Sequence, residues 1–361
     1  MNQMTPRERV LTALDRRPPD HVPFEISFGA FTPELMETFV RKTGALDPAA
    51  YWDFPVRTIH LRYEPSYEFW RRYAAYHPAT FPPGANITPF GTVYCLGSVK
   101  HFEKALHPLK RAATEDEVAA YPLPDPADPA CFAHLKNCAT QLHAANLAVA
   151  GQLYCTIFET SWAIRGFEEL MTDLMANPGM VEILFDRLTE IRMAQARQYA
   201  EAGVDVIALG DDIATQQGLM MSLPVWEHWL KPRLARIIAA AREVNPDIHI
   251  FYHSDGNCQD AIPGLIDIGV TVLNPVQPEC MDPAEIKSEF GDRLAFWGTI
   301  GTQTTMPFGT PDDVRAIVRK RIETVGNGGG LLLAPTHILE PEVPWDNIVA
   351  FIEAVKSYGC E

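Results

Sequence analysis

The residues best placed for chemistry are His253 and Asp255, which follow an apolar and aromatic run in the stretch IHIFYHSDGN at 248–257. An imidazole and a carboxylate can bind a divalent metal ion or move a proton. An apolar run of this length that ends at a glycine is typical of a buried strand entering a loop. In parallel α/β proteins, such loops usually carry the chemistry. The alternative is that both side chains only cap the next helix or hydrogen-bond to one another.

Polar side chains also follow the other predicted strands. These strand-end candidates are Glu159, Asp211, Asp212, His253, Asp255, Asn274, Gln277 and His337. In a closed barrel they would all face one mouth, so His253 and His337 could meet. Two imidazoles with one or two carboxylates suffice for a divalent metal with an open position, and equally for a metal-free acid–base site. The spacing leaves both readings open.

Cys258 and Cys280 offer a different metal set, in which zinc is bound by one histidine and two thiolates. Cys258 follows His253 closely, and Cys280 lies in a loop after a Pro-Glu pair. Their spacing matches no known zinc knuckle, so the favoured interpretation is two free thiols.

The elements that must position these residues alternate regularly in the second part of the chain. Apolar stretches predict strands at 148–157, 204–209, 248–252, 270–273, 294–297 and 330–334. Helical patterns lie between and after them, at 166–176, 178–203, 223–244, 259–268, 283–290, 311–325 and 344–358. Continuous apolar strands that alternate with amphipathic helices indicate a parallel sheet covered on both faces.

About six such strand–helix units follow residue 145, and about two more fit into the first third, which favours a (β/α)8 TIM barrel. An open doubly wound sheet is the alternative. That fold predicts a glycine-rich phosphate loop between an early strand and a helix. The sequence GNGGG at 326–330 precedes a strand instead, so it does not meet this requirement.

The first third is predicted to be less regular. Thr5 and Pro6 begin a helix as cap and first residue, residues 22–27 (VPFEIS) form a short strand interrupted by the acidic Glu25, and a helix spans 32–42. Residues 64–129 are rich in proline and aromatics and predict an excursion or lid, with an antiparallel element around 92–96 and a linker at 122–129. We expect one domain over residues 1–361. Asp53 is either a helix cap or a site carboxylate.

The net charge, the cysteine count and the lengths of the apolar runs argue against several classes of protein. The net charge of −16 argues against a nucleic-acid or anionic-membrane partner. Seven cysteines, an odd number without close pairs, do not form a disulfide framework. The first residues lack the apolar core of a signal peptide, and no apolar run reaches the roughly 18 residues of a membrane span. A cytoplasmic location is therefore expected.

Several stretches together resemble the uroporphyrinogen decarboxylase superfamily. They are GFEELMTDLMANPGMVEILFDRLTEI, AGVDVIALGDDIATQQG, FYHSDGN, LIDIGVTVLNPVQP, FGDRLAFWGTIGTQ, GTPDDV and LLLAPTHILEPEVPWDNI. The resemblance covers about residues 1–358 in order and is densest from 150 onward. It implies a (β/α)8 barrel with the site at its carboxyl mouth, and often a homodimer.

The decarboxylases of this superfamily hold the carboxylates of their tetrapyrrole with an Arg-Gln-Ala-Gly-Arg-Tyr segment. The matching stretch here, VPFEISFGAFTPEL, has no arginine and offers Glu25. Because carboxylates pair with arginine, a polycarboxylated ring would be repelled. His337 nevertheless matches the decarboxylases' histidine in the last strand loop, and Asp53 corresponds to their catalytic aspartate.

The corrinoid-linked methyltransferases of the superfamily bind zinc through His-x-Cys after this same strand and through a cysteine in the last strand loop. His253 keeps the first ligand, Asp255 replaces the first cysteine, and Thr336 or His337 replaces the second. A set of His253, Asp255 and His337 is harder than His-Cys-Cys and favours polarising a substrate oxygen over binding a thiolate. Such a ligand set fits an enzyme that removes a methyl group from a methoxy or similar donor.

The first third of the chain also contains aromatic residues that suit an apolar or aromatic donor, although packing in the core or at a dimer interface explains them equally. They are Tyr51, Trp52, Phe54, Tyr63, Phe69 and Trp70.

The prediction is a methyltransferase that moves a methyl group between a small-molecule donor and a partner corrinoid protein. Zinc or another divalent metal is expected at His253, Asp255 and His337. Cobalamin would be carried by the partner, since the chain has no Asp-x-His-x-x-Gly loop. The predicted catalytic residues are His253, Asp255, His337 and Asp53, and the substrate-binding residues are Glu25, Tyr154, Glu159, Asp211, Asp212, Asn274 and Gln277.

Two alternatives remain. The first is a cofactor-free decarboxylase, in which Asp53 or Asp255 stabilises a protonated ring near His337. The second is a non-catalytic barrel that binds a tetrapyrrole or a corrinoid protein.

Overall fold

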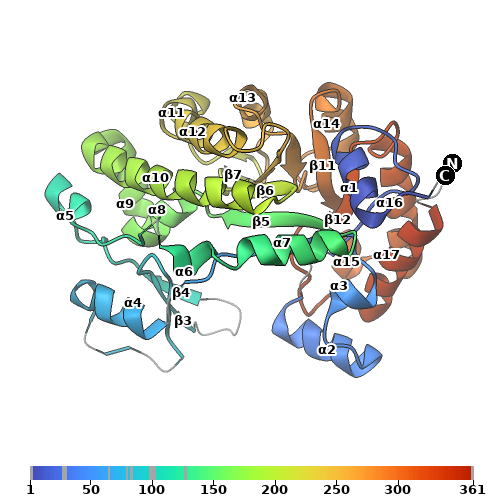
Figure 1. Ribbon diagram of the computed structural model, residues 1–361, viewed down its shortest axis with the longest axis horizontal. Helices are drawn as coiled ribbons and strands as arrows, with labels where there is room; N and C mark the ends of the chain where they lie inside the picture. The colour runs from blue at the N-terminus through green and yellow to red at the C-terminus, as the bar shows by residue number, and fades with distance from the viewer. Residues whose placement is uncertain are drawn as a thin grey trace.

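A curled parallel sheet forms the centre of the computed structural model, which describes residues 3–26, 31–63, 66–78, 80–81, 84–96, 103–125 and 128–358. Its seven strands lie in the order β1-β5-β6-β9-β10-β11-β12 (Figure 1). Their bounds are Val56–Ile59, Ala148–Tyr154, Val206–Gly210, His249–His253, Val272–Asn274, Ala295–Ile300 and Leu331–Pro335. The sequence between the strands supplies covering helices, so the predicted (β/α)8 TIM-barrel class is confirmed.

The eighth strand position is occupied by a very short segment around Phe24. Phe24 forms an isolated parallel bridge with Leu333 of β12, through hydrogen bonds from Glu25 N to Leu333 O (3.1 Å) and from Leu333 N to Pro23 O (2.9 Å). Pro23 has no N–H to extend a ladder. The predicted strand at 22–27 is therefore reduced to a bridge, and Ser27 lies outside the described residues.

The inside of the barrel is filled by small and aromatic side chains from the strands, and helix α1 (Pro6–Leu14) covers one end. Val10 and Leu14 of α1 belong to the same buried cluster as Phe251 and Trp297. The predicted cap is present, because the Thr5 side chain accepts a hydrogen bond from the backbone N of Glu8. The amino end of the barrel is thus closed, which leaves the carboxyl end for a site.

Helices form the outer layer and bury a second, larger cluster against the strands. Along the barrel they are α7 (Leu135–Ala144), α8 (Phe158–Arg165), α9 (Phe167–Ala176), α10 (Pro178–Ala202), α11 (Leu223–Trp229), α12 (Lys231–Arg242), α13 (Ile262–Asp267), α14 (Pro283–Phe290), α15 (Thr305–Phe308), α16 (Pro311–Thr324) and α17 (Trp345–Tyr358). Helices α2 (Pro33–Thr43) and α3 (Pro48–Tyr51) precede β1. None of the helices in the described part of the chain is both long and apolar enough to span a membrane.

The single helix predicted at 223–244 is wrong, because the chain breaks at Leu230 into α11 and α12. Pro232 lacks the N–H that would continue the first helix, and its ring would clash with the preceding turn. The helix predicted at 259–268 likewise begins as a 3-10 turn, Gln259–Ala261, before α13.

The amino end of α16 carries a complete capping box. The Thr310 hydroxyl accepts from Asp313 N (3.2 Å), and the Asp313 carboxylate accepts from Thr310 N (2.8 Å). Thr310→Ala is expected to lower the free energy of unfolding by about 1 kcal/mol, because the Asp313 N–H loses its acceptor. Denaturant titration measures the change. Thr310→Ser keeps the hydroxyl and should retain most of that stability, so an equal loss in both variants would contradict the capping argument.

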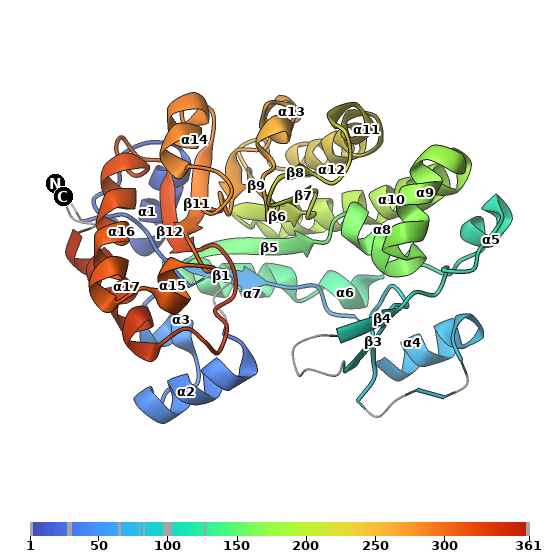
Figure 2. The same ribbon diagram turned by 180° about the vertical axis from the view of Figure 1, so that it is seen from behind.

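Residues 66–125 form the excursion, which lies beside α8 and the carboxyl end of β5 (Figures 1 and 2). It contains α4 (Ser66–Tyr73), a 3-10 turn (Ala74–Tyr76) and α5 (Glu115–Ala119), and α6 (Pro129–Phe132) follows it. Its antiparallel sheet joins β2 (Asn86–Ile87), β3 (Val93–Leu96) and β4 (Glu103–Leu106), which confirms the element expected around 92–96. Its aromatic core packs on Ile164 and Leu188 of the barrel helices. A role as a lid stays a prediction.

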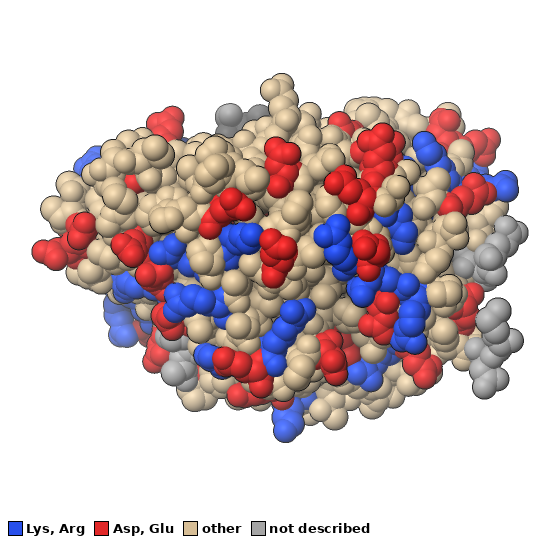
Figure 3. All heavy atoms as spheres, turned by 90° about the horizontal axis from the view of Figure 1, so that it is seen from above, with Lys and Arg blue, Asp and Glu red and all other residues tan. Residues whose placement is uncertain are grey.

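Charge is distributed rather than concentrated on the face that Figure 3 shows, where acidic and basic side chains are interspersed. The acidic residues responsible for the net charge of −16 therefore form no single patch on this face. A nucleic-acid-binding surface usually gathers its Lys and Arg residues on one face, and the described residues on this face do not show that pattern.

Candidate functional site

The register of three neighbouring strands brings the predicted site residues together. His253, the last residue of β9, is paired with Gly210 at the end of β6 and with Asn274 at the end of β10. A side chain at Gly210 would collide with His253, since a Cβ there would lie 2.6 Å from the His253 Cβ. Glycine at this position therefore allows the imidazole to sit between the two neighbouring strand ends.

A chain of hydrogen bonds fixes the orientation of the His253 ring. Asn274 Nδ2 donates to the backbone oxygen of Trp297 at 2.6 Å, so its Oδ1 faces His253 Nδ1 at 2.5 Å. Because this oxygen can only accept, Nδ1 must carry the proton. A neutral His253 then carries its lone pair on Nε2, the nitrogen through which it would bind a metal ion, in the arrangement typical of metal-binding histidines.

Two carboxylates lie next to His253 Nε2. The distance from Nε2 to Asp212 Oδ1 is 3.6 Å, and the same Asp212 oxygen accepts from Asp255 N at 2.8 Å. One ligand atom each from Asp212, His253 and Asp255 lies within 4.8 Å of the others. One imidazole nitrogen and two carboxylate oxygens are a suitable set for a divalent ion with open positions. These three residues are called the metal cluster below.

His337 lies in the loop after β12, and the structure places it near Asp255. Burial raises the pKa of the Asp255 carboxyl, whereas the nearby His253 and His337 each oppose that rise. His337 is exposed and is not one of the three residues of the metal cluster among the described residues. The charges of both histidines thus act on the same carboxylate, and Asp212 takes the place in the metal cluster that was predicted for His337.

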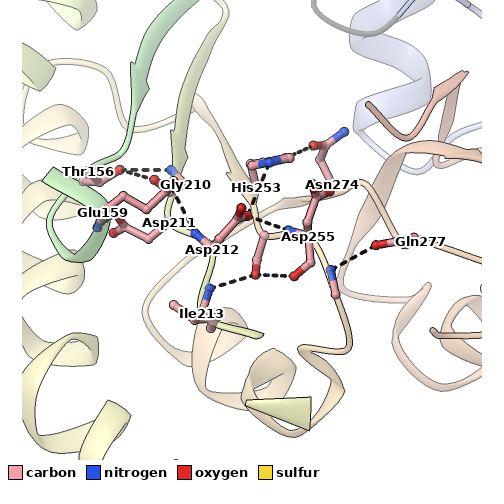
Figure 4. Close-up of polar contacts among 12 residues, drawn as sticks. Thr156, Glu159, Gly210, Asp211, Asp212, Ile213, His253, Asp255, Asn274 and Gln277 are labelled. Carbon is pink, nitrogen blue, oxygen red and sulfur yellow. Dashed lines mark hydrogen bonds and ion pairs between the residues drawn. The ribbon is translucent and has the colours of Figure 1, made fainter. Parts of the chain in front are cut away.

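Two further carboxyls, Asp211 and Glu159, lie on one side of Asp212, and Gln277 lies on the other (Figure 4). Asp211 accepts from the backbone N of Ile157 (3.0 Å) and of Glu159 (3.0 Å). Glu159 Oε2 accepts from Asp212 N at 3.1 Å. Burial, followed in size by the charges of Asp211 and Asp212, raises the pKa of Glu159 to about 8. Burial also raises the pKa of Asp211 to about 6.

The raised pKa of Glu159 predicts a pH-dependent stability. A carboxyl with a folded pKa above its unfolded value contributes stability that is complete below the unfolded pKa and lost as the pH rises through the folded pKa. That window runs from 4.5 to about 8. Glu159→Gln keeps an acceptor oxygen but cannot ionise.

Relative to Glu159→Gln, the EDTA-treated wild-type protein should therefore lose stability as the pH rises from about 5 to about 8. Denaturant titrations at a series of pH values measure this difference. If the unfolding free energies of the two proteins changed in parallel with pH, burial would not raise the pKa of the Glu159 carboxyl.

The remaining predicted site residues occupy different places. Gln277 accepts from Gly256 N at 3.1 Å and so holds the loop after Asp255. Glu25 is buried inside the barrel, where it accepts from Trp297 Nε1 at 2.8 Å. The Tyr154 ring lies between Phe251 and His253, with each pair of ring centroids 5.9 Å apart.

Asp53 is not brought to the others. It precedes β1, has a φ of 58° and is exposed. Within the described residues it makes no hydrogen bond or ion pair with the other predicted site residues. Its catalytic role stays a prediction without geometric support.

Neither candidate thiol joins the metal cluster in the part of the chain that the structure describes. Cys258 is buried, and burial raises its thiol pKa to about 12. Cys280 is half-buried, and burial raises its thiol pKa as well. A thiol held in its neutral form is a poor metal ligand, which agrees with the interpretation as free thiols.

Sequence reasoning missed three residues of the site. Trp297 orients Asn274 and binds Glu25. Ser254 is fully buried and accepts from Ile213 N at 3.2 Å, which connects the loops after β6 and β9. Arg192 lies in the middle of α10 and is buried next to Thr156. An arginine in an amphipathic helix normally faces solvent, so only the packing shows that this one faces the site.

Comparison with known proteins adds a family and a fold. Residues 103–358 match the family described as uroporphyrinogen decarboxylase (URO-D). The chain is 23% identical over 361 residues, 99% of both chains, to the methylcobamide:CoM methyltransferase MtbA of Methanosarcina mazei. It is 30% identical over 179 residues to the methylcobamide:CoM methyltransferase MtaA of Methanosarcina barkeri, and that match spans about half of each chain (50% and 49%). A uroporphyrinogen decarboxylase of Chlorobium limicola is 24% identical over 182 residues, 50% of this chain and 49% of that one.

Among solved structures, a methyltransferase from Methanosarcina mazei superimposes with a TM-score of 0.70. The identity is 20%, and the match covers 98% of this chain and 99% of the other. At this identity the likeness supports the fold alone.

Proposed function

The chain belongs to the uroporphyrinogen decarboxylase (URO-D) family, and on that premise we propose that it is a corrinoid-linked methyltransferase. It moves a methyl group between a small-molecule donor and a corrinoid carried by a partner protein, with a divalent metal at the metal cluster. The full-length relatives named as methylcobamide:CoM methyltransferases support the methyl-transfer branch of the family. Assembly as a homodimer and a cytoplasmic location are further predictions.

The observation that carries the proposal is the preset Nε2 lone pair of His253 beside two carboxylates. Asp212, His253 and Asp255 would hold the metal, and His337 lines the same cavity as Asp255. An ion with these hard ligands would polarise a donor oxygen and draw charge from it as the methyl group leaves. Asn274 keeps the histidine in its ligating tautomer, and the backbone N–H of Asp255 holds the Asp212 carboxylate in place.

The charge of the mouth supports methyl transfer over tetrapyrrole decarboxylation. Three aspartates, Asp211, Asp212 and Asp255, lie together there. Carboxylates attract a metal cation but repel a polycarboxylated ring. The arginine-rich segment that holds such a ring in the decarboxylases has no counterpart in this sequence.

Metal analysis and a methyl-transfer assay test the proposal together. Protein purified without chelators should contain about one divalent ion per chain. Its cobalt(II) derivative should lack the charge-transfer band of a thiolate ligand, because the metal cluster contains no cysteine. With cob(I)alamin and aryl or alkyl methyl ethers as probes, the holoprotein should form methylcobalamin. A metal-free protein that consumes uroporphyrinogen would overturn the proposal in favour of the decarboxylase alternative.

A further inference from the structure

A cavity of about 410 Å³ lies between the excursion and the barrel mouth. Five of its wall residues are aromatic, and they come from both sides: Tyr63, Phe90, Tyr94, Tyr154 and Trp162. It is called the aromatic cavity below. Small-molecule sites have volumes of about 300–1,000 Å³ and mostly apolar walls with a few polar groups, so this cavity has the size and lining for one small ligand.

The aromatic cavity adjoins the metal cluster. Its wall residue Tyr154 lies next to His253, with their ring centroids 5.9 Å apart. Its wall residue Glu159 accepts from Asp212 N at 3.1 Å. A ligand in the cavity would therefore have one end at the residues proposed to hold the metal.

A second cavity, of about 440 Å³, is lined mostly by polar residues, Asp255, Gln277 and His337 among them. Figure 4 shows Glu159 and Gln277 on opposite sides of Asp212. The metal cluster thus has an aromatic space on one side and a polar space on the other. The ring of an aromatic donor would bind in the aromatic space.

Arg192 gives the aromatic cavity a fixed positive charge. It is 5% exposed and donates to four neutral acceptors: Thr156 O (2.9 Å), Cys155 O (2.9 Å), Gln195 Oε1 (2.9 Å) and Thr160 Oγ1 (3.1 Å). Among the described residues it forms no ion pair. The Phe90 ring lies 4.9 Å from its guanidinium carbon.

A guanidinium has about five N–H donors. In the described part of the chain these four bonds leave one Nη1–H of Arg192 without an acceptor. A guanidinium is a strong partner for a carboxylate. Its hydrogen-bond partners are all neutral, although its charge also opposes the rise that burial causes in the pKa of the nearby Asp211 carboxyl. A negative group on a ligand would give this guanidinium a direct charged partner.

We propose that the aromatic cavity binds the methyl donor, and that this donor is a small aromatic methyl ether with a carboxylate substituent. The ring packs between the aromatic walls, the carboxylate points to Arg192, and the methoxy group points to the metal cluster. The reaction in this inference rests on the proposed function, whereas the class of ligand is inferred from the lining of the aromatic cavity.

The reaction balances for such a donor. The bond between the methyl carbon and the ether oxygen breaks, and the methyl carbon bonds to the partner's cob(I)alamin-type cobalt, which becomes formally Co(III). The electron pair of the broken bond stays on the phenolate oxygen, which takes a proton from solvent.

Binding of 4-methoxybenzoate to the metal-free protein, measured by calorimetry, tests the ligand class without any turnover. Phe90→Ala and Tyr94→Leu should each weaken binding by about tenfold, because each removes an aromatic wall. Phe308→Ala is the matched control, since Phe308 is 78% exposed and lies outside this cavity. Arg192→Lys should reduce the preference for 4-methoxybenzoate over 4-methoxybenzamide, a ratio that general destabilisation would not change.

The outcomes separate this inference from the proposed function. His253→Ala should lose the metal and methyl transfer but still bind 4-methoxybenzoate. If the wild type binds the acid and never transfers its methyl group, the proposed function fails while the cavity assignment stands. The inference is overturned if the wild type does not bind the acid, if folded Phe90→Ala and Tyr94→Leu bind it unchanged, or if the aliphatic methyl donor glycine betaine binds more tightly.

Discussion

Replacing His253 with alanine is expected to remove the metal ion and methyl transfer together while the barrel still folds. His253 is the only nitrogen ligand of the metal cluster among the described residues, and its ring is held in the ligating tautomer by Asn274. Without it, two carboxylates would have to hold the ion alone. The loss of metal affinity should exceed the roughly 10- to 100-fold that removal of a ligand's hydrogen-bond partner costs.

His249→Ala provides a matched control for this prediction. His249 and His253 are the first and last residues of the same strand, β9, and His249 faces Asp15 instead, with Nε2 3.4 Å from Oδ1. Elemental analysis of both purified variants, together with methylcobalamin formation, measures the effect. A His253→Ala protein with full metal content, or equal losses in both variants, would exclude the metal cluster as the binding site.

Replacing Asn274 with alanine should weaken metal binding by roughly 10- to 100-fold although no ligand is removed. The alanine cannot accept the Nδ1 proton, so His253 is free to rotate or to change its tautomer, and less of the protein presents Nε2 to the ion. Titration of the EDTA-treated protein with zinc against a competing chelator measures the affinity. Methyl transfer at limiting zinc should fall in parallel and recover in excess zinc.

Asn347→Ala is the control for Asn274→Ala. Asn347 is also a buried asparagine, and its Nδ2 donates to two backbone oxygens, of Met306 and Gly309, at 2.8 Å. Its replacement should lower thermal stability and leave zinc affinity unchanged. Unchanged affinity in Asn274→Ala would mean that the hydrogen bond to Asn274 does not prepare His253 for a metal.

The sequence by itself determined the class of fold and the strand that carries the central histidine. Alternating apolar runs and helical patterns are local features, so they identified the strands of the sheet and the loops that follow them. The cap at Thr5 was also predicted, because a cap depends on residues within one turn. The break at Pro232 was available from the same local signal, yet the apolar periodicity on both sides concealed it.

Only the tertiary structure decided which of the strand-end residues meet. Asp212 lies beside His253 because Gly210, two residues before Asp212, is paired with His253 between the neighbouring strands β6 and β9. Such a register depends on contacts between residues far apart in the sequence. The same applies to Trp297 and Glu25, which meet inside the barrel although 272 positions separate them. Arg192 looks like any surface arginine of an amphipathic helix until α10 is packed against the loop after β5. Periodicity reports which face of an element is apolar, whereas the curl and register of the sheet determine which polar side chains share a site.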